Sequence, residues 1–186
     1  MIKPASAFRL LAATLALAVA LAFSTSPSRA ASCPAAGAVN NAASAFMNAA
    51  RSGSAAAFSS ALARHADVRG AALSALGQYR RELPRSRQRE YVDHAHAFMA
   101  RFLLENSRPF RGSRDLRIES CRGNLVETSL AGRSRMVWRV SDGRIRDVRV
   151  GGVWLALQLR SKFTGIIRRH NGRVEALLDY LDGSGD

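Results

Sequence analysis

The residues best able to do chemistry are few and isolated in this chain. His94 and His96 have a spacing that suggests a metal-binding pair. They fall in a segment with helical periodicity, where this spacing directs two side chains about 200° apart, so they do not share one ion. Cys33 and Cys121 each lack a second cysteine at zinc-ligand spacing. We therefore expect no metal site and no cofactor.

A second group of candidates would support nucleophilic catalysis. The segment Gly132-Arg133-Ser134-Arg135-Met136 resembles a nucleophile elbow only in part, because its last glycine is missing and it lies between two expected strands. We interpret it as a turn. No local pattern favours a catalytic triad, and no glycine-rich phosphate loop is present.

Asp147 is the acidic residue with the strongest case for a catalytic role. A carboxylate on a curved sheet can act as a general base in an apolar cavity. A second acid would be needed beside it, and none is evident. The favoured interpretation is a structural ion pair with Arg160, since both residues flank the same glycine pair, Gly151-Gly152.

Helical periodicity dominates the first half of the chain, from Gly37 to about Phe110. Asp67 is placed to cap one of these helices, and Pro84 precedes the longest. The many alanines allow helices to pack closely. The first helix has an apolar stripe that contains Val39, Ala42, Phe46 and Ala50.

At Arg114 the apolar period changes from 3.6 to 2, which indicates strands. Four short runs follow, separated by tight turns such as Asp142-Gly143, and this pattern predicts an antiparallel meander. After Gly151-Gly152 the helical period returns and continues to Leu181. The sequence therefore predicts an α+β fold, with N-terminal helices, a four-stranded twisted antiparallel sheet and C-terminal helices.

Residues 1–30 have the three parts of an export signal. Lys3 and Arg9 form the basic start, an apolar run of 14 residues follows, and small residues precede a cleavage site after Ala30. A membrane-spanning helix needs about 20 residues, so a permanent anchor is the weaker alternative. We expect a signal peptide over residues 1–30, a single domain over residues 31–186, and a periplasmic location.

The chain is strongly basic, and removing the signal lowers its formal net charge from +14 to +11. Export, scattered arginines and an aromatic content of only 7% argue against a nucleic-acid partner. Anionic lipid headgroups and acidic proteins remain as partners, and solubility alone is the other explanation.

The two cysteines that remain after export form an even count. In an oxidising compartment this favours a disulfide between Cys33 and Cys121. Two unpaired thiols are the alternative, because the sequence does not show that the two sites meet.

A family resemblance spans roughly residues 66–181. Residues 147–153 (DVRVGGV) and 160–163 (RSKF) resemble the signature of the MlaC family, also described as the toluene-tolerance auxiliary component of ABC transporters. Residues 72–80 and 86–102 are similar to its preceding helices. Trp154 and Arg144 depart from the usual pattern, so a cargo that differs from the family's is an alternative.

The resemblance implies a carrier, without enzymatic activity, that encloses the acyl chains of a phospholipid between a curved sheet and helices. It also implies an inner-membrane ABC transporter with an MCE component as partner, and an outer-membrane lipoprotein complex as a further one. The hopanoid-associated HpnM branch is equally similar, so a hopanoid-type lipid is an alternative cargo. An enzyme that uses Asp147 and a basic adaptor without ligand are the alternative functions.

The apolar residues of these elements form the expected lipid cavity or, in the other interpretation, a filled core. The expected lining consists of Leu76, Phe98, Phe102, Ile118, Val126, Met136, Trp138, Val140, Val150, Phe163 and Ile167.

Overall fold

Helix ends follow local signals in the computed structural model, which describes residues 33–112, 116–132 and 134–184. Helix α1 (Ala36–Ser52) ends at Gly53, which adopts a φ of 63°. Ser54 caps α2 (Ala55–His65), and Asp67 caps α3 (Val68–Ala75) by accepting the Gly70 N–H at 3.1 Å. The expected signal peptide lies outside the described residues.

The remaining helices surround the longest one, α4 (Gln88–Glu105). Short 3₁₀ turns η1 (Gly77–Arg81) and η2 (Arg85–Arg87) precede α4, and η3 (Arg108–Phe110) follows it. Helices α5 (Leu155–Arg169) and α6 (Glu175–Asp182) close the chain. No helix within the described ranges has the length and apolar character needed to cross a membrane.

In the part of the chain that the structure describes, one antiparallel sheet lies between the two groups of helices in the sequence. Its strands run in chain order, β1 (Leu116–Arg122), β2 (Leu125–Leu130), β3 (Ser134–Ser141), β4 (Arg144–Val150) and β5 (Val153–Trp154). The predicted α+β meander is confirmed, with one correction to the strand count. The two residues of β5 pair with β4 across the Gly151-Gly152 turn, and a two-residue strand is too short to show alternation in a sequence.

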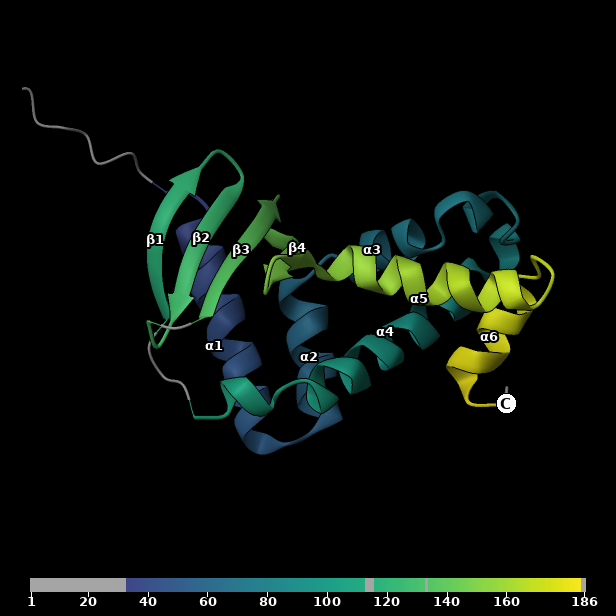
Figure 1. Cartoon of the computed structure of the whole chain (residues 1–186), viewed down its shortest axis with the longest axis horizontal. Helices are drawn as coiled ribbons and strands as arrows, with labels where there is room; N and C mark the ends of the chain where they lie inside the picture. The colour runs from purple at the N-terminus through teal and green to yellow at the C-terminus, as the bar shows by residue number, and fades with distance from the viewer. Residues whose placement is uncertain (1–32, 113–115, 133, 185–186) are drawn as a thin grey trace, which may run out of the picture. The chain divides into compact units, whose positions relative to one another are not determined.

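The apolar interior falls into distinct clusters. Helices α3, α4, α5 and α6 pack around Tyr91 and Phe163, whose rings meet edge-on at 6.4 Å. The Tyr91 hydroxyl donates to the Ala72 carbonyl at 2.6 Å, so this buried polar atom is satisfied. A second cluster joins α1 to one face of the sheet, and a third joins α1, α2 and α4. Figure 1 shows α1 behind β1 to β3, and β4 leading into α5 beside α3.

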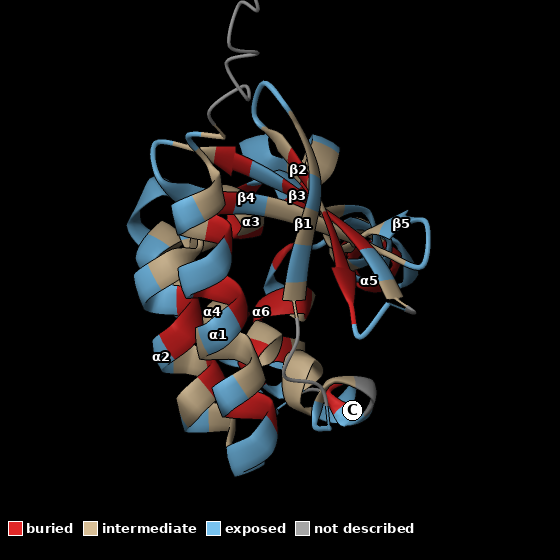
Figure 2. Cartoon of the chain, turned by 90° about the vertical axis from the view of Figure 1, so that its left-hand side faces the viewer, coloured by how far each residue is buried: buried red, intermediate tan, exposed pale blue. Residues whose placement is uncertain are grey.

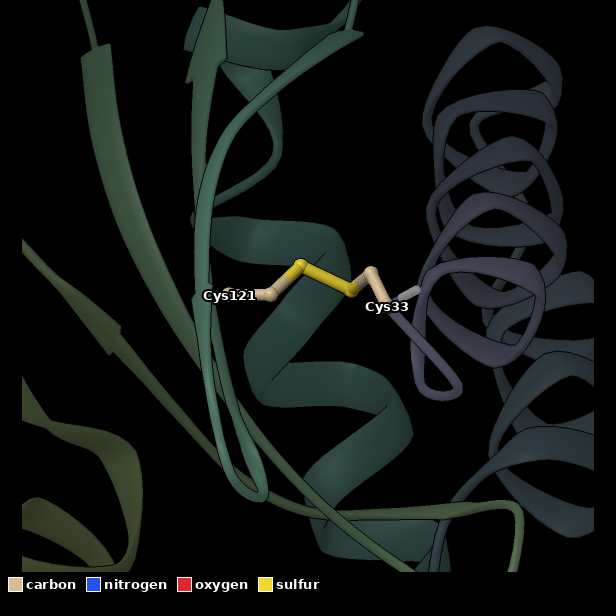
Figure 3. Close-up of a disulfide and its surroundings, with 2 residues drawn as sticks. All are labelled: Cys33 and Cys121. Atoms are coloured by element: carbon tan, nitrogen blue, oxygen red, sulfur yellow. A yellow bond between two sulfur atoms is a disulfide. The ribbon is translucent and has the colours of Figure 1, made fainter. Parts of the chain in front are cut away.

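A disulfide ties the two parts of the second cluster together. Cys33, just before α1, is bonded to Cys121 on β1, with their Cα atoms 5.8 Å apart (Figure 3). The bond closes a loop with a sequence separation of 88 residues. It therefore fixes the first turn of α1 against the edge of the sheet.

Candidate functional site: an apolar cavity between helices and sheet

A large cavity lies between the helices and the sheet. Its volume is about 1040 Å³, at the upper end of the range of about 300–1,000 Å³ typical of ligand pockets. Helices α1, α2, α4 and α5 and strands β3 and β4 supply most of the wall. Figure 2 shows α1 and α2 on one side and β1 to β3 on the other.

The sheet contributes the inward-facing residues of β3 and β4. Met136 and Trp138 line the cavity, and their register partners Val150 and Val148 do so as well. Paired residues share one face of a sheet, so these four side chains form a continuous apolar surface. Trp138 donates its indole N–H to the Thr128 hydroxyl at 2.9 Å, which leaves only its apolar ring facing the cavity.

Helix α4 supplies aromatic side chains to the opposite wall. Phe98 and Phe102 stack with their ring centroids 6.3 Å apart, one helical turn from each other. Both rings are only partly buried although they lie inside the fold, because one side of each faces the cavity. The wall therefore presents apolar surface that no protein atom covers.

Five of the eleven expected lining residues do line the cavity: Phe98, Phe102, Met136, Trp138 and Val150. The other six do not line the cavity and pack only against protein side chains. Leu76, Phe163 and Ile167 face the contacts among α3, α4, α5 and α6, where they are fully buried. Ile118, Val126 and Val140 pack against the disulfide end of α1, whose alanines let the helix approach the sheet closely.

Sequence reasoning missed the contribution of α1 and α2 to the wall. Phe46 and Met47 of α1 and Phe58 and Leu62 of α2 line the cavity. The stripe that contains Phe46 was visible as an apolar helix face. Periodicity identifies such a face without indicating whether it meets another helix or a ligand.

The mouth of the cavity is defined by the exposed lining residues around the turn from β4 to α5, whereas two other exposed lining residues, Asn106 and Arg146, lie elsewhere in the wall. The β3–β4 register places Arg135 one step beyond the Met136–Val150 pair, beside this turn. We use the term cavity mouth for Arg135, Gly151, Gly152, Gln158 and Lys162. The mouth carries two cations and no acid, whereas the walls behind it are mostly apolar.

Asp147 caps a helix instead of pairing with an arginine. Its Oδ1 accepts the Val148 N–H at 2.8 Å and the Ala156 N–H at 3.1 Å, the second of which belongs to the first turn of α5. Trp154 occupies the N-cap position of α5 but its side chain accepts no hydrogen bond from the helix. The Asp147 side chain on β4 therefore takes over the capping role. Burial raises the pKa of the Asp147 carboxyl, although the two N–H bonds and nearby Arg139 act in the opposite direction.

The expected ion pair between Asp147 and Arg160 is wrong for the described residues, among which no salt bridge joins the two. The Arg160 guanidinium packs against Gly77, where a Cβ atom would lie 2.8 Å from its Nε. Gly77 has a φ of 57°, which also favours glycine. Arg160 is therefore drawn along α5 toward η1, away from the sheet.

The histidines contact different elements and form no common site. His96 Nε2 lies 3.0 Å from the Ser59 carbonyl on α2, whereas His94 Nε2 lies 3.8 Å from Asp182 at the end of α6. No group of three or more metal-ligating side chains occurs in the part of the chain that the structure describes.

A small α+β fold that encloses a cavity of this size behind apolar walls defines a protein able to hold an apolar ligand. The model of the MlaC protein family matches residues 39–182, and the chain belongs to this family. A similar solved structure is that of a phospholipid-binding protein from Ralstonia solanacearum in complex with a phospholipid. The two are 17% identical with a TM-score of 0.62, over 80% of this chain and 92% of that one, which shows a shared fold. None of the curated proteins compared with the chain matches it in sequence.

Proposed function

We propose that this protein is a non-enzymatic carrier that shields the acyl chains of a membrane phospholipid. The cavity carries the proposal, because it combines a volume of about 1040 Å³ with walls of aromatic and alkyl side chains. The similar Ralstonia solanacearum protein was solved with a phospholipid, which supports the same class of ligand here. A hopanoid-type lipid is the second candidate cargo, since it would bury its apolar body in the same way.

The energetics explain why such a lipid needs a carrier. Each buried methylene contributes about 0.8 kcal/mol, so two acyl chains of about 15 methylenes each correspond to roughly 24 kcal/mol of gross burial. A bare lipid therefore does not cross water at a useful rate. The cavity replaces most of this burial, and the headgroup stays at the mouth, where Arg135 and Lys162 favour a phosphate.

The wider setting is part of the proposal. The family membership and the expected signal peptide support a periplasmic carrier that passes its lipid to or from an ABC transporter with an MCE component. An outer-membrane lipoprotein complex is a further proposed partner. The basic charge of the chain suits either a negatively charged protein or a lipid surface.

Catalysis through Asp147 is the less favoured alternative. Asp147 Oδ1 is already engaged by two backbone N–H groups. Asp67, the other described carboxylate in the cavity wall, caps α3 and pairs with Arg146. Both carboxyl groups therefore have structural partners, and neither is available as the second acid that catalysis through the other would need.

Tryptophan fluorescence offers a direct test, because the chain has two tryptophans and only Trp138 lines the cavity. We would load W154F with a phospholipid that carries bromine on its acyl chains. Bromine quenches indole emission at short range, so the remaining Trp138 should lose most of its emission relative to the same protein loaded with unbrominated lipid. Mass spectrometry of the gently purified protein should find about one lipid per chain.

The matched control is W138F, in which Trp154 alone reports. Trp154 lies outside the cavity wall, with Arg139 and Arg149 over its ring. We expect clearly weaker quenching in this variant. Equal quenching in both variants, or protein that purifies and remains without lipid, would rule out a lipid-filled cavity.

A further inference from the structure

Two exposed apolar side chains stand next to the cavity mouth. Among the described residues, Val153 and Leu157 are the only large apolar side chains that are exposed, at 45% and 56%. Their neighbours Gly151, Gly152 and Gln158 belong to the mouth itself. Figure 2 shows β5 and the start of α5 close together at one edge of the fold. The exposed large apolar side chains of the described residues therefore lie beside the cavity mouth.

All charged residues in the segment around the Gly151-Gly152 turn are basic. Residues 148–174 contain six arginines and lysines and no acidic residue. On α5, Leu157 and Arg168 are both exposed and lie on one face of the helix, so apolar and basic groups share that face. The nearest acid in the sheet, Asp147, is opposite Arg139 in the register but is bonded to two backbone amides.

Trp154 follows Val153 at the same edge of the sheet, and its pairing with Arg149 places its ring on the opposite face of β5. The Arg139 guanidinium lies 4.4 Å from the centre of its ring, and that of Arg149 lies 5.4 Å away. Cation–π contact holds both arginines beside β5. A tryptophan flanked by arginines suits a membrane interface, where the ring lies among headgroups and the cations meet phosphates.

We propose that this mouth surface, consisting of Val153, Trp154, Leu157, Arg139, Arg149 and Lys162, docks onto an anionic phospholipid bilayer. The inference rests on the proposed carrier function, because docking would place the cavity mouth against the membrane and let acyl chains enter without crossing water. Charge complementarity favours the bilayer, since the six residues of this surface include three cations and no acid. Two inserted side chains give weak and reversible attachment, as a carrier requires.

The first experiment removes the apolar part of the surface with V153T/L157Q, which keeps side-chain size and local propensities. Binding to vesicles of phosphatidylcholine with phosphatidylglycerol is measured by flotation, with pure phosphatidylcholine vesicles alongside. Wild type should prefer the anionic vesicles and lose affinity as salt rises. The variant should bind them about tenfold more weakly, since it loses most of the apolar insertion.

The second experiment separates the local cations from the total charge. R139Q/R149Q removes two arginines of the mouth surface and leaves the cavity wall intact. R80Q/R89Q, the matched control, removes two exposed arginines from η1 and α4. We expect about tenfold weaker binding and a flatter salt dependence for the first variant, and near wild-type binding for the control.

Lipid content separates the two proposals. Protein that carries lipid but does not bind anionic vesicles, or that loses binding equally in R139Q/R149Q and R80Q/R89Q, overturns the docking surface alone. Unchanged vesicle binding in V153T/L157Q also overturns it. The same holds if wild type forms a dimer that V153T/L157Q dissociates, because the two apolar residues would then contact a second copy of the chain. Absence of lipid from the cavity contradicts the carrier function instead, whatever the vesicle result.

Discussion

Asp147 contributes a pH dependence whose sign follows from its surroundings. Burial raises the pKa of this carboxyl, so folding favours its protonated form. The corresponding stability is fully present below the pKa of the unfolded chain and is lost as the pH rises through the higher pKa of the folded protein. D147N keeps an oxygen that can accept the N–H groups of Val148 and Ala156 but does not ionise.

We therefore expect the stability of D147N relative to wild type to improve between about pH 3 and about pH 7. Urea unfolding of both proteins across this range measures the difference, in which contributions from the other carboxylates cancel. A difference that stays constant, or that moves in favour of wild type as the pH rises, contradicts a raised pKa.

The same residue marks a limit of sequence reasoning. A structural role for Asp147 was predictable from the many arginines and the glycine pair that follows it. Its true partner, the Ala156 N–H, was not, because a backbone donor has no sequence signature. The start of α5 reaches Asp147 only because β5 folds back on β4.

At the scale of elements, the disulfide is the clearest source of stability that can be removed. It joins Cys33 before α1 to Cys121 on β1, with a sequence separation of 88 residues. Closing a loop of this length in the unfolded chain is worth about 4.6 kcal/mol in the chain-entropy model. We expect C33S/C121S to lose about this much free energy of unfolding.

Urea unfolding of the oxidised protein and the double variant measures this loss, and reduced wild type serves as the matched control. Thiol labelling under denaturing, non-reducing conditions should find no free cysteine in the mature protein. Two labelled cysteines per chain would contradict the pairing.

Helices and strands were largely predictable, whereas the boundary between core and cavity was not. Phe98 and Phe163 lie on neighbouring helices with their rings 5.4 Å apart, and both fit the apolar period. Only Phe98 lines the cavity, while Phe163 is fully buried. An apolar period reports that a side chain leaves water, and it contains no information on whether protein or ligand replaces the water.

At the scale of the whole molecule, an apolar cavity links lipid binding to stability. A ligand that binds the folded chain alone raises its stability, and an emptied cavity of about 1040 Å³ leaves its walls without that contribution. Removing the lipid should therefore lower Tm, and returning it should restore the original value. This change in Tm follows from the presence of the cavity and does not depend on any one residue.

A cavity-filling variant makes this last prediction specific. Ala71 lines the cavity from α3 and is only partly buried, so A71F places a ring in space that the lipid would occupy. We expect A71F to carry less lipid and to show a smaller fall in Tm on delipidation than wild type. A63F, on the exposed side of α2 and outside the cavity wall, is the matched control and should behave like wild type. Scanning calorimetry before and after lipid extraction measures each Tm, with mass spectrometry to record lipid content. If extraction lowers Tm equally in all three proteins, the stabilising lipid lies outside this cavity.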